Sequence, residues 1–186
     1  MKPIVFFALS LFAGFISGCG EKKKFSEYSE GFRKLARADE GIFRGYEPGM
    51  SFQAVKNAEP GRPVQEEKDY LFYEYREKNG EMFTLEFVFD QGILQEFRLD
   101  GYYIAKGDAR TLFLEIKEFF ESRYGEGEDY FGFSGWVLKK NDRLIYCELK
   151  DESSEYRQGK LSLFVYKHEE PTAPKPNAGL PEPSNP

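Results

Sequence analysis

Apolar residues recur at helical spacing in three stretches of the chain, which predicts three amphipathic helices. The first stretch runs from residue 25 to residue 36. The second begins after Ser51, which is expected to act as N-cap, and ends before Pro60. In the third, Asp108 is expected to cap the helix and Gly125 to end it. The apolar positions are Phe25, Tyr28, Phe32, Leu35 and Ala36, then Phe52 and Val55, then Leu112, Ile116, Phe119 and Phe120.

Alternating apolar and polar residues predict antiparallel strands after the second and third helices. The first group contains Leu71–Tyr75, Phe83–Phe89, and a strand with one face formed by Ile93, Gln95, Phe97 and Leu99. Its turns are Asn79-Gly80, expected to be type I′, and Asp90-Gln91-Gly92. The second group is Trp136–Lys139, Leu144–Leu149 after an Asn141-Asp142 turn, and Leu161–Tyr166.

The order of a helix followed by a three-stranded meander therefore occurs twice. We predict an α+β protein of two tandem units, in which two sheets share a helical layer and so bury more surface than either alone. The expected segments are 1–18 (lipoprotein signal), 19–41 (lipidated linker and short helix), 42–106 (first unit), 107–168 (second unit) and 169–186 (disordered Pro-rich tail).

The N-terminal residues have the layout of an export signal. Lys2 precedes an apolar stretch from Ile4 to Ile16, which is too short to span a bilayer. The run Ile16-Ser17-Gly18-Cys19 resembles the lipobox of bacterial lipoproteins, which implies cleavage before Cys19 and acylation of its thiol. The alternative is an ordinary signal peptide in which a Cys follows Gly18 by chance. Gly20 resembles the outer-membrane sorting pattern of a Gram-negative cell.

The charge of the chain argues against a nucleic-acid partner. Cleavage before Cys19 removes Lys2 and no acidic residue, so the 26 basic residues become 25 against 32 acidic ones, a net charge of −7. A polyanion binder needs a basic face, whereas here acids and bases are interspersed. The segment 169–186 contains almost nothing apolar and is therefore expected to be disordered.

Few residues of this chain are suited to catalysis or metal binding. His168 is the only histidine, which argues against Ser-His-Asp or Cys-His catalysis and against zinc sites. Cys147 is expected to be a buried, inert thiol, with a reactive thiol as the alternative. We expect solvated loops at the acidic residues Glu126, Glu128 and Asp129 and at the segment 151–155. No cofactor and no metal are predicted.

An aromatic segment after the third helix is the candidate partner-binding surface. Tyr130, Phe131, Phe133 and Trp136 alternate with small residues there, and rigid aromatic anchors are typical of interface hot spots. The alternative is that these rings fold back and cover the open end of the sheet, since a chain with 17% aromatic residues must bury most of them. Tyr102 and Tyr103 present the same two alternatives.

Part of the chain resembles a known family. The residues concerned are Pro48-Gly49-Met50-Ser51 with Val55, Gly61-Arg62-Pro63, Tyr73, Tyr75, and the run from Phe87 to Leu94. They resemble the SmpA/OmlA (BamE) family of envelope lipoproteins over roughly residues 45–99. The resemblance implies helices against an antiparallel three-stranded sheet and a role in outer-membrane protein assembly. The two-unit layout is similar to the tandem architecture of the β-lactamase inhibitor protein.

Together these features predict a membrane-anchored bacterial lipoprotein that acts by binding another envelope protein, as a scaffold in envelope assembly or maintenance, and that is not an enzyme. The expected location is the cell envelope, facing the periplasm from the outer membrane in a Gram-negative cell. The alternative is a lipid-anchored inhibitor of a secreted or periplasmic enzyme. A third alternative is an enzyme using paired carboxylates.

Overall fold

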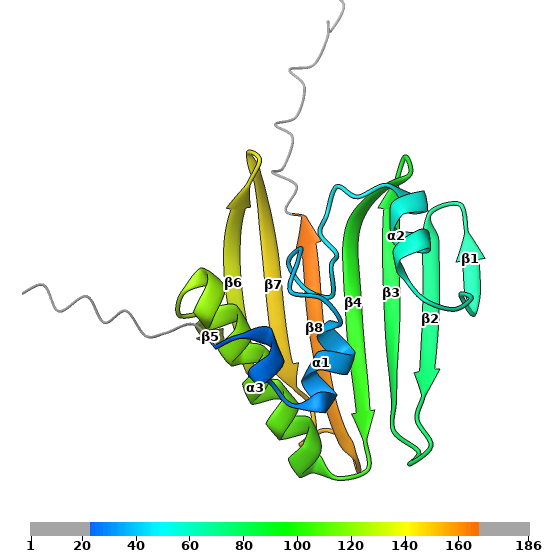
Figure 1. The fold of residues 1–186 in the computed structure, drawn as a ribbon. Coiled ribbons are helices and arrows are strands. Elements are labelled where there is room, and N and C mark those ends of the chain that lie inside the picture. The colour runs from blue at the N-terminus through cyan, green and yellow to red at the C-terminus, as the bar shows by residue number, and fades with distance from the viewer. Residues whose placement is uncertain (1–22, 168–186) are drawn as a thin grey trace, which may run out of the picture.

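Eight antiparallel strands form one continuous sheet in the computed structural model, which describes residues 23–167 (Figure 1). The strand order is β1-β2-β3-β4-β8-β7-β6-β5. The predictions for the signal segment 1–18, for Cys19, for His168 and for the tail 169–186 lie outside the described residues. The strands are β1 Gln65–Glu67, β2 Tyr70–Arg76, β3 Met82–Asp90, β4 Ile93–Tyr103, β5 Glu128–Tyr130, β6 Phe133–Lys140, β7 Arg143–Asp151 and β8 Gly159–Lys167.

The two groups of strands meet where β4 pairs with β8. The pairing runs from Glu96 opposite Tyr166 to Tyr103 opposite Gly159. The strand order is therefore symmetric about this seam, with the short strands β1 and β5 at the two edges. The expectation of two separate sheets is wrong, because pairing β4 with β8 satisfies backbone groups that would otherwise form two exposed edges.

The helices all lie on one face of the sheet, as Figure 1 shows. They are a 3₁₀ helix, η1 (Phe25–Glu27), and the α-helices α1 (Glu30–Ala36), α2 (Phe52–Ala58) and α3 (Lys106–Tyr124). The single helix predicted for residues 25–36 is instead η1 and α1. Ser29 separates them, because its hydroxyl caps α1 at the amide of Phe32 while its own amide donates to Glu115 of α3.

The ends of the other two helices match the prediction at three of four points. Ser51 caps α2 by accepting a hydrogen bond from the amide of Ala54, and α2 ends before Pro60. Gly125 ends α3 with a φ of 88°. Asp108 is not the cap: α3 begins at Lys106, and Asp108 lies within its first turn, where a carboxylate favours the positive end of the helix dipole.

A bulge in β4 changes which residues face the core. The pairing of β3 with β4 shifts between Val88 and Phe89, so that Val88 pairs with Glu96 and Phe89 pairs with Leu94. Gln95 takes up the extra position, and Leu94 is buried while Ile93 is exposed. The predicted face of Ile93, Gln95, Phe97 and Leu99 is therefore correct only for its last two members.

All three predicted hairpin turns are present, but Asn79-Gly80, the one expected to be type I′, has another form. Residues 91–92 and residues 141–142 form two-residue turns with positive φ at both positions. Around Asn79 only Gly80 has a positive φ, and the amide of Glu77 pairs with the carbonyl of Glu81. The loop thus has three residues with glycine in the left-handed position, which is another favoured hairpin connection.

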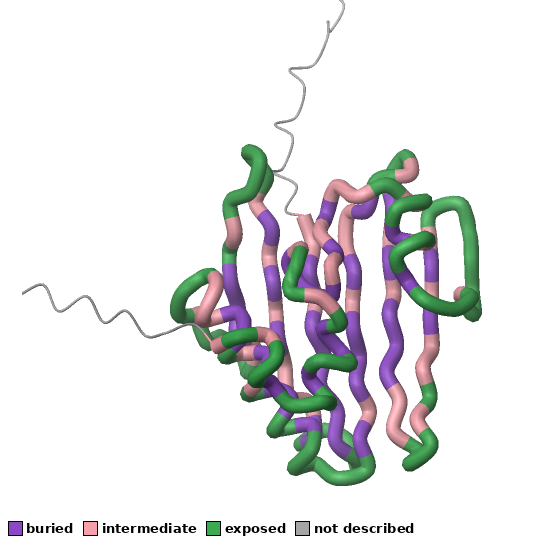
Figure 2. The backbone as a smooth tube through the Cα atoms, in the orientation of Figure 1, coloured by how far each residue is buried: buried purple, intermediate pink, exposed green. Residues whose placement is uncertain are grey.

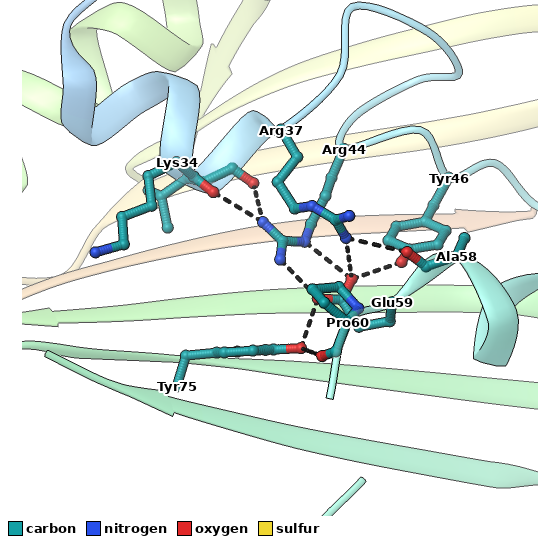
Figure 3. A network of polar contacts seen from close by, with 9 residues as sticks. Lys34, Arg37, Arg44, Tyr46, Ala58, Glu59, Pro60 and Tyr75 are labelled. Atoms are coloured by element: carbon teal, nitrogen blue, oxygen red, sulfur yellow. Dashed lines mark hydrogen bonds and ion pairs between the residues drawn. The ribbon is translucent and has the colours of Figure 1, made fainter. Parts of the chain in front are cut away.

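The hydrophobic core lies between the helices and the face of the sheet that they cover, as the buried segments of Figure 2 show. A buried polar cluster near one end of this core joins three elements (Figure 3). Glu59 follows α2, and its carboxylate accepts hydrogen bonds from Arg44 in the preceding loop and from Tyr75 in β2. The hydroxyl of Tyr46 donates to the same carboxylate.

Among residues 23–167, no helix is long and apolar enough to cross a membrane.

Candidate binding surface

The second face of the sheet carries no helix, and its side chains are partly exposed. We call it the open face. Its side chains line up in cross-strand rows, since residues paired across an antiparallel sheet point to the same side. The upper row, in strand order, is Tyr70, Val88, Glu96, Tyr166, Tyr146 and Val137. The lower row is Phe72, Glu86, Arg98, Phe164, Glu148 and Gly135.

Three rings form the centre of these rows. Tyr146 and Tyr166 stack with their ring centroids 5.5 Å apart and their planes 15° apart. Phe164 lies 5.5 Å from Tyr166 in a tilted arrangement. Half-buried aromatic rings on a rigid sheet lose little conformational entropy on binding, so they suit a contact surface.

Charged groups surround the rings. The hydroxyls of Tyr130 and Tyr166 both donate to Oε1 of Glu148, over 2.7 Å and 2.8 Å. Burial, with the nearby charge of Glu148, raises the pKa of Tyr166 to about 12. The guanidinium carbon of Arg98 lies 5.9 Å from the centroid of Phe164, while its Nε lies 2.9 Å from Asp100. A mixture of tyrosine, phenylalanine and arginine is the composition favoured in the centre of protein interfaces.

One carboxylate at the seam, that of Glu96, is held in a less polar environment than water. Burial raises the pKa of Glu96, and the nearby carboxylate of Glu86 adds to the effect. Glu96 belongs to the upper row, where it pairs with Val88. Glu86 belongs to the lower row, where it pairs with Arg98. A partner that places a positive charge here would therefore favour the ionised form of Glu96.

The loop between β7 and β8 covers the end of the open face beyond these rows. Lys160 is buried, and its Nζ contacts Glu152 at 2.8 Å and the Tyr156 hydroxyl at 3.1 Å. The hydroxyl of Ser162 lies 2.6 Å from Glu152 and also contacts Asp100. The segment 151–155 is thus only partly a solvated loop, because Glu152 is tied to the sheet. These contacts cover part of the open face beyond the lower row.

The predicted aromatic segment divides between both faces of the sheet. Tyr130 and Phe133 reach the open face and stack with centroids 6.0 Å apart. The ring of Tyr130 lies directly over Gly135, where a Cβ would approach it to 2.4 Å. Phe131 lies at the tip of the β5–β6 hairpin and is 96% exposed.

Trp136 does not belong to the accessible surface. It is 4% exposed, lies on the helix side of the sheet, and packs against Phe120 of α3 at 4.9 Å. Its indole N–H donates to the carbonyl of Gly125. Trp136 therefore follows the alternative stated above, in which rings fold back over the sheet, and we remove it from the candidate surface. Tyr103 is likewise buried, whereas Tyr102 is half-buried on the open face.

Three other residues considered in the sequence lie in strands of the sheet: Cys147 in β7, and Glu128 and Asp129 in β5. Cys147 is fully buried beside Ile145 and Leu149, as expected, and burial raises the pKa of its thiol. Glu128 and Asp129 are exposed as predicted but lie in β5, not in a loop. Asp129 accepts hydrogen bonds from Ser134 and Lys117, which lower the pKa of its carboxyl group.

A cleft of about 430 Å³ lies between α1, α3 and the β2–β3 hairpin. Its polar lining includes Glu30, Glu81 and Asp108, together with an ion pair between Lys34 and Glu77. Within residues 23–167, no three histidine, cysteine or acidic side chains are grouped so as to hold a metal ion. The cleft is thus lined by acidic groups and by the hydroxyls of Ser29 and Thr111.

Sequence reasoning missed the aromatic residues at the centre of the open face. Strands β2, β7 and β8 contain apolar residues at consecutive positions, as in Leu71-Phe72-Tyr73 and Leu163-Phe164-Val165. A strand with one face in water normally alternates with polar residues. Apolar residues on both faces were therefore the available signal that the second face also makes contacts.

This chain matches no protein-family model, no curated protein and no solved structure.

Proposed function

We propose that this protein is a lipid-anchored lipoprotein of the bacterial cell envelope that binds another envelope protein through the two rows of the open face. The observation that carries the proposal is the row arrangement itself, in which Tyr146, Tyr166 and Phe164 are flanked by Glu148 and Arg98. Acylation of Cys19 would hold this surface at a membrane, facing the periplasm from the outer membrane in a Gram-negative cell.

We also propose that the two halves are related units. The order helix, short edge strand and three long strands holds for α2 with β1–β4 and for α3 with β5–β8. The sheet order supports the proposal, because the two sets of strands are arranged symmetrically about the β4–β8 seam. The likeness to BamE in residues 45–99 and to the tandem inhibitor architecture belongs to the same proposal.

Site-specific crosslinking in the native envelope tests the binding function. A photoreactive amino acid at Tyr146 or at Phe72, on opposite sides of the seam, should capture the same partner. The same group at Gln53, an exposed position of α2 on the helix side, is the matched control and should not. Arg98→Glu, which reverses the charge beside Phe164, should abolish capture from both open-face positions while the fold is retained.

The identity of the captured protein separates the candidate functions. A subunit of an envelope assembly machine would support the scaffold role. A soluble hydrolase would support the alternative, a lipid-anchored enzyme inhibitor, which is favoured by one observation: exposed Phe131, at the tip of the β5–β6 hairpin, follows the exposed acids Glu128 and Asp129. Equal capture from Gln53 and from the open-face positions would refute specific binding through the open face.

A further inference from the structure

Phe131 is the most exposed large apolar side chain of the described chain, at 96%. It also has a backbone conformation that bulky residues avoid, with a φ of 48°. The other two-residue hairpin turns place Gln91-Gly92 and Asn141-Asp142 at the corresponding positions. Asparagine, aspartate and glycine are the residues that such turns favour. A phenylalanine here costs folding stability without packing against the protein, which indicates that it contacts something else.

The hairpin tip and the start of the described chain lie on the same side of the molecule. Lys23 forms an ion pair of 2.8 Å with Glu118 of α3, and its Nζ lies 4.3 Å from the ring centroid of Tyr28. The preceding residue of α3, Lys117, pairs with Asp129 of β5, two residues before Phe131. Figure 1 shows the chain beginning beside α3 on the β5 side of the sheet.

Only a short tether separates this side from the proposed lipid anchor. Four residue steps join Cys19 to Lys23, which span at most about 14 Å of extended chain. An acylated Cys19 would therefore hold Lys23 within that distance of the bilayer, and the β5 side is the side of the sheet nearest to Lys23. Leu114 lies one helical turn before Glu118, and it is 50% exposed. This part of the molecule thus has the exposed apolar side chains Leu114 and Phe131, and its acids Glu118 and Asp129 are paired with lysines.

We propose that Phe131 inserts into the lipid interface as a second membrane contact beside the acyl chains of Cys19. This inference rests on the lipidation proposed above. In segments that lie on a membrane surface, phenylalanine is one of the residues buried at the boundary between headgroups and acyl chains. With its β5 edge at the membrane, the sheet would stand upright on the bilayer and leave its open face accessible from the side. The lipid anchor would then set the orientation as well as the location of the binding surface.

The depth of residue 131 in a bilayer tests this inference. The full mature chain, purified from bacterial membranes and reconstituted in phosphatidylcholine vesicles, carries an environment-sensitive fluorophore on a cysteine introduced by Phe131→Cys. Cys147 is buried and does not compete for the label. Val64→Cys, 66% exposed beside the opposite edge strand, is the control. Spin-labelled lipids should quench the probe at residue 131 several-fold more strongly than the probe at residue 64.

The possible results separate this inference from its premise. Equal, weak quenching at the two positions, in protein whose mass shows an acylated Cys19, would overturn the membrane contact and leave the lipid anchor standing. A chain with no acyl mass at Cys19 would overturn both. If the probe at 131 is shielded only when a captured envelope protein is present, Phe131 occupies a protein pocket and the lipid contact is refuted.

Discussion

Arg44 donates two parallel hydrogen bonds to the carboxylate of Glu59, from Nη2 to Oε1 at 2.6 Å and from Nε to Oε2 at 3.1 Å. Both side chains are buried. The remaining guanidinium nitrogen donates to the carbonyl oxygens of Lys34 and Leu35 at the end of α1. This ion pair therefore joins the end of α1, the loop that carries Arg44, and the end of α2. The hydroxyl of Tyr75 donates to the same carboxylate and so connects β2 to them.

We expect Glu59→Gln to destabilise the protein by about 3–5 kcal/mol, because it leaves the buried charge of Arg44 without a counter-ion. Urea unfolding, followed by the fluorescence of Trp136, measures the loss. Lys34→Ala is the matched control: it breaks an exposed ion pair with Glu77 and should cost no more than about 1 kcal/mol. Equal losses in the two variants would show that the Arg44–Glu59 pair is not a structural joint.

The same pair predicts how stability depends on pH. Burial opposes ionisation of Glu59, but the hydrogen bonds and charge of Arg44, with the hydroxyls of Tyr46 and Tyr75, outweigh it and lower the pKa of that carboxyl group below its usual value of 4.5. The folded state then binds the proton less readily than the unfolded state. The stabilisation from Glu59 is therefore complete above pH 4.5 and is lost as the pH falls through the folded-state pKa.

Unfolding free energies of the native chain and of Glu59→Gln, measured from neutral pH downwards, check the sign. The difference between the two should be constant at neutral pH and should shrink below pH 4.5. A difference that grows on acidification would mean that the pKa of Glu59 is raised in the folded protein.

Local patterns predicted most elements of this fold because hairpins and amphipathic helices are determined by neighbouring residues. The β4–β8 pairing was not predictable in this way, since Glu96 and Tyr166 are far apart in sequence. Nor was the bulge at Gln95, because alternation alone continues the face from Ile93. At the candidate surface, Tyr130 and Phe133 were identified from the alternation of aromatic and small residues. Tyr146 and Phe164 belong to other strands, and only strand pairing brings them to the same face of the sheet.

The contact between Gly159 and the start of α3 leads to a prediction about packing. A Cβ at Gly159 would lie 2.6 Å from the carbonyl oxygen of Ala105 and 2.9 Å from Cβ of Ala109. Because backbone atoms form the closest contact, Gly159→Ala should cost about 1–3 kcal/mol. Gly107→Ala, in α3 with open space around its Cβ, should be neutral or stabilising by up to about 1 kcal/mol. Thermal unfolding of the two variants compares them, and a tolerated Gly159→Ala would contradict the close approach.

The burial of Cys147 predicts that its thiol is inert in the folded protein. It lies at 0% exposure in β7, and burial raises its pKa, so both access and the thiolate fraction are low. A thiol reagent should label it only as fast as the protein unfolds, and the rate should rise with urea. Rapid labelling in native buffer, with intact circular dichroism, would show that β7 opens locally beneath the open face.

The conformation of Phe131 predicts a gain in stability when the residue is replaced. Phe131→Asn should stabilise the protein by about 1 kcal/mol, because asparagine tolerates the left-handed conformation at φ 48° and the exposed ring loses no contact of its own. Asn141→Phe, at φ 50° in the β6–β7 turn, is the converse substitution and should destabilise by a similar amount. Thermal unfolding in the absence of membranes measures both. If Phe131→Asn lowers stability instead, the ring serves the fold, and the argument that it is kept for an external contact fails.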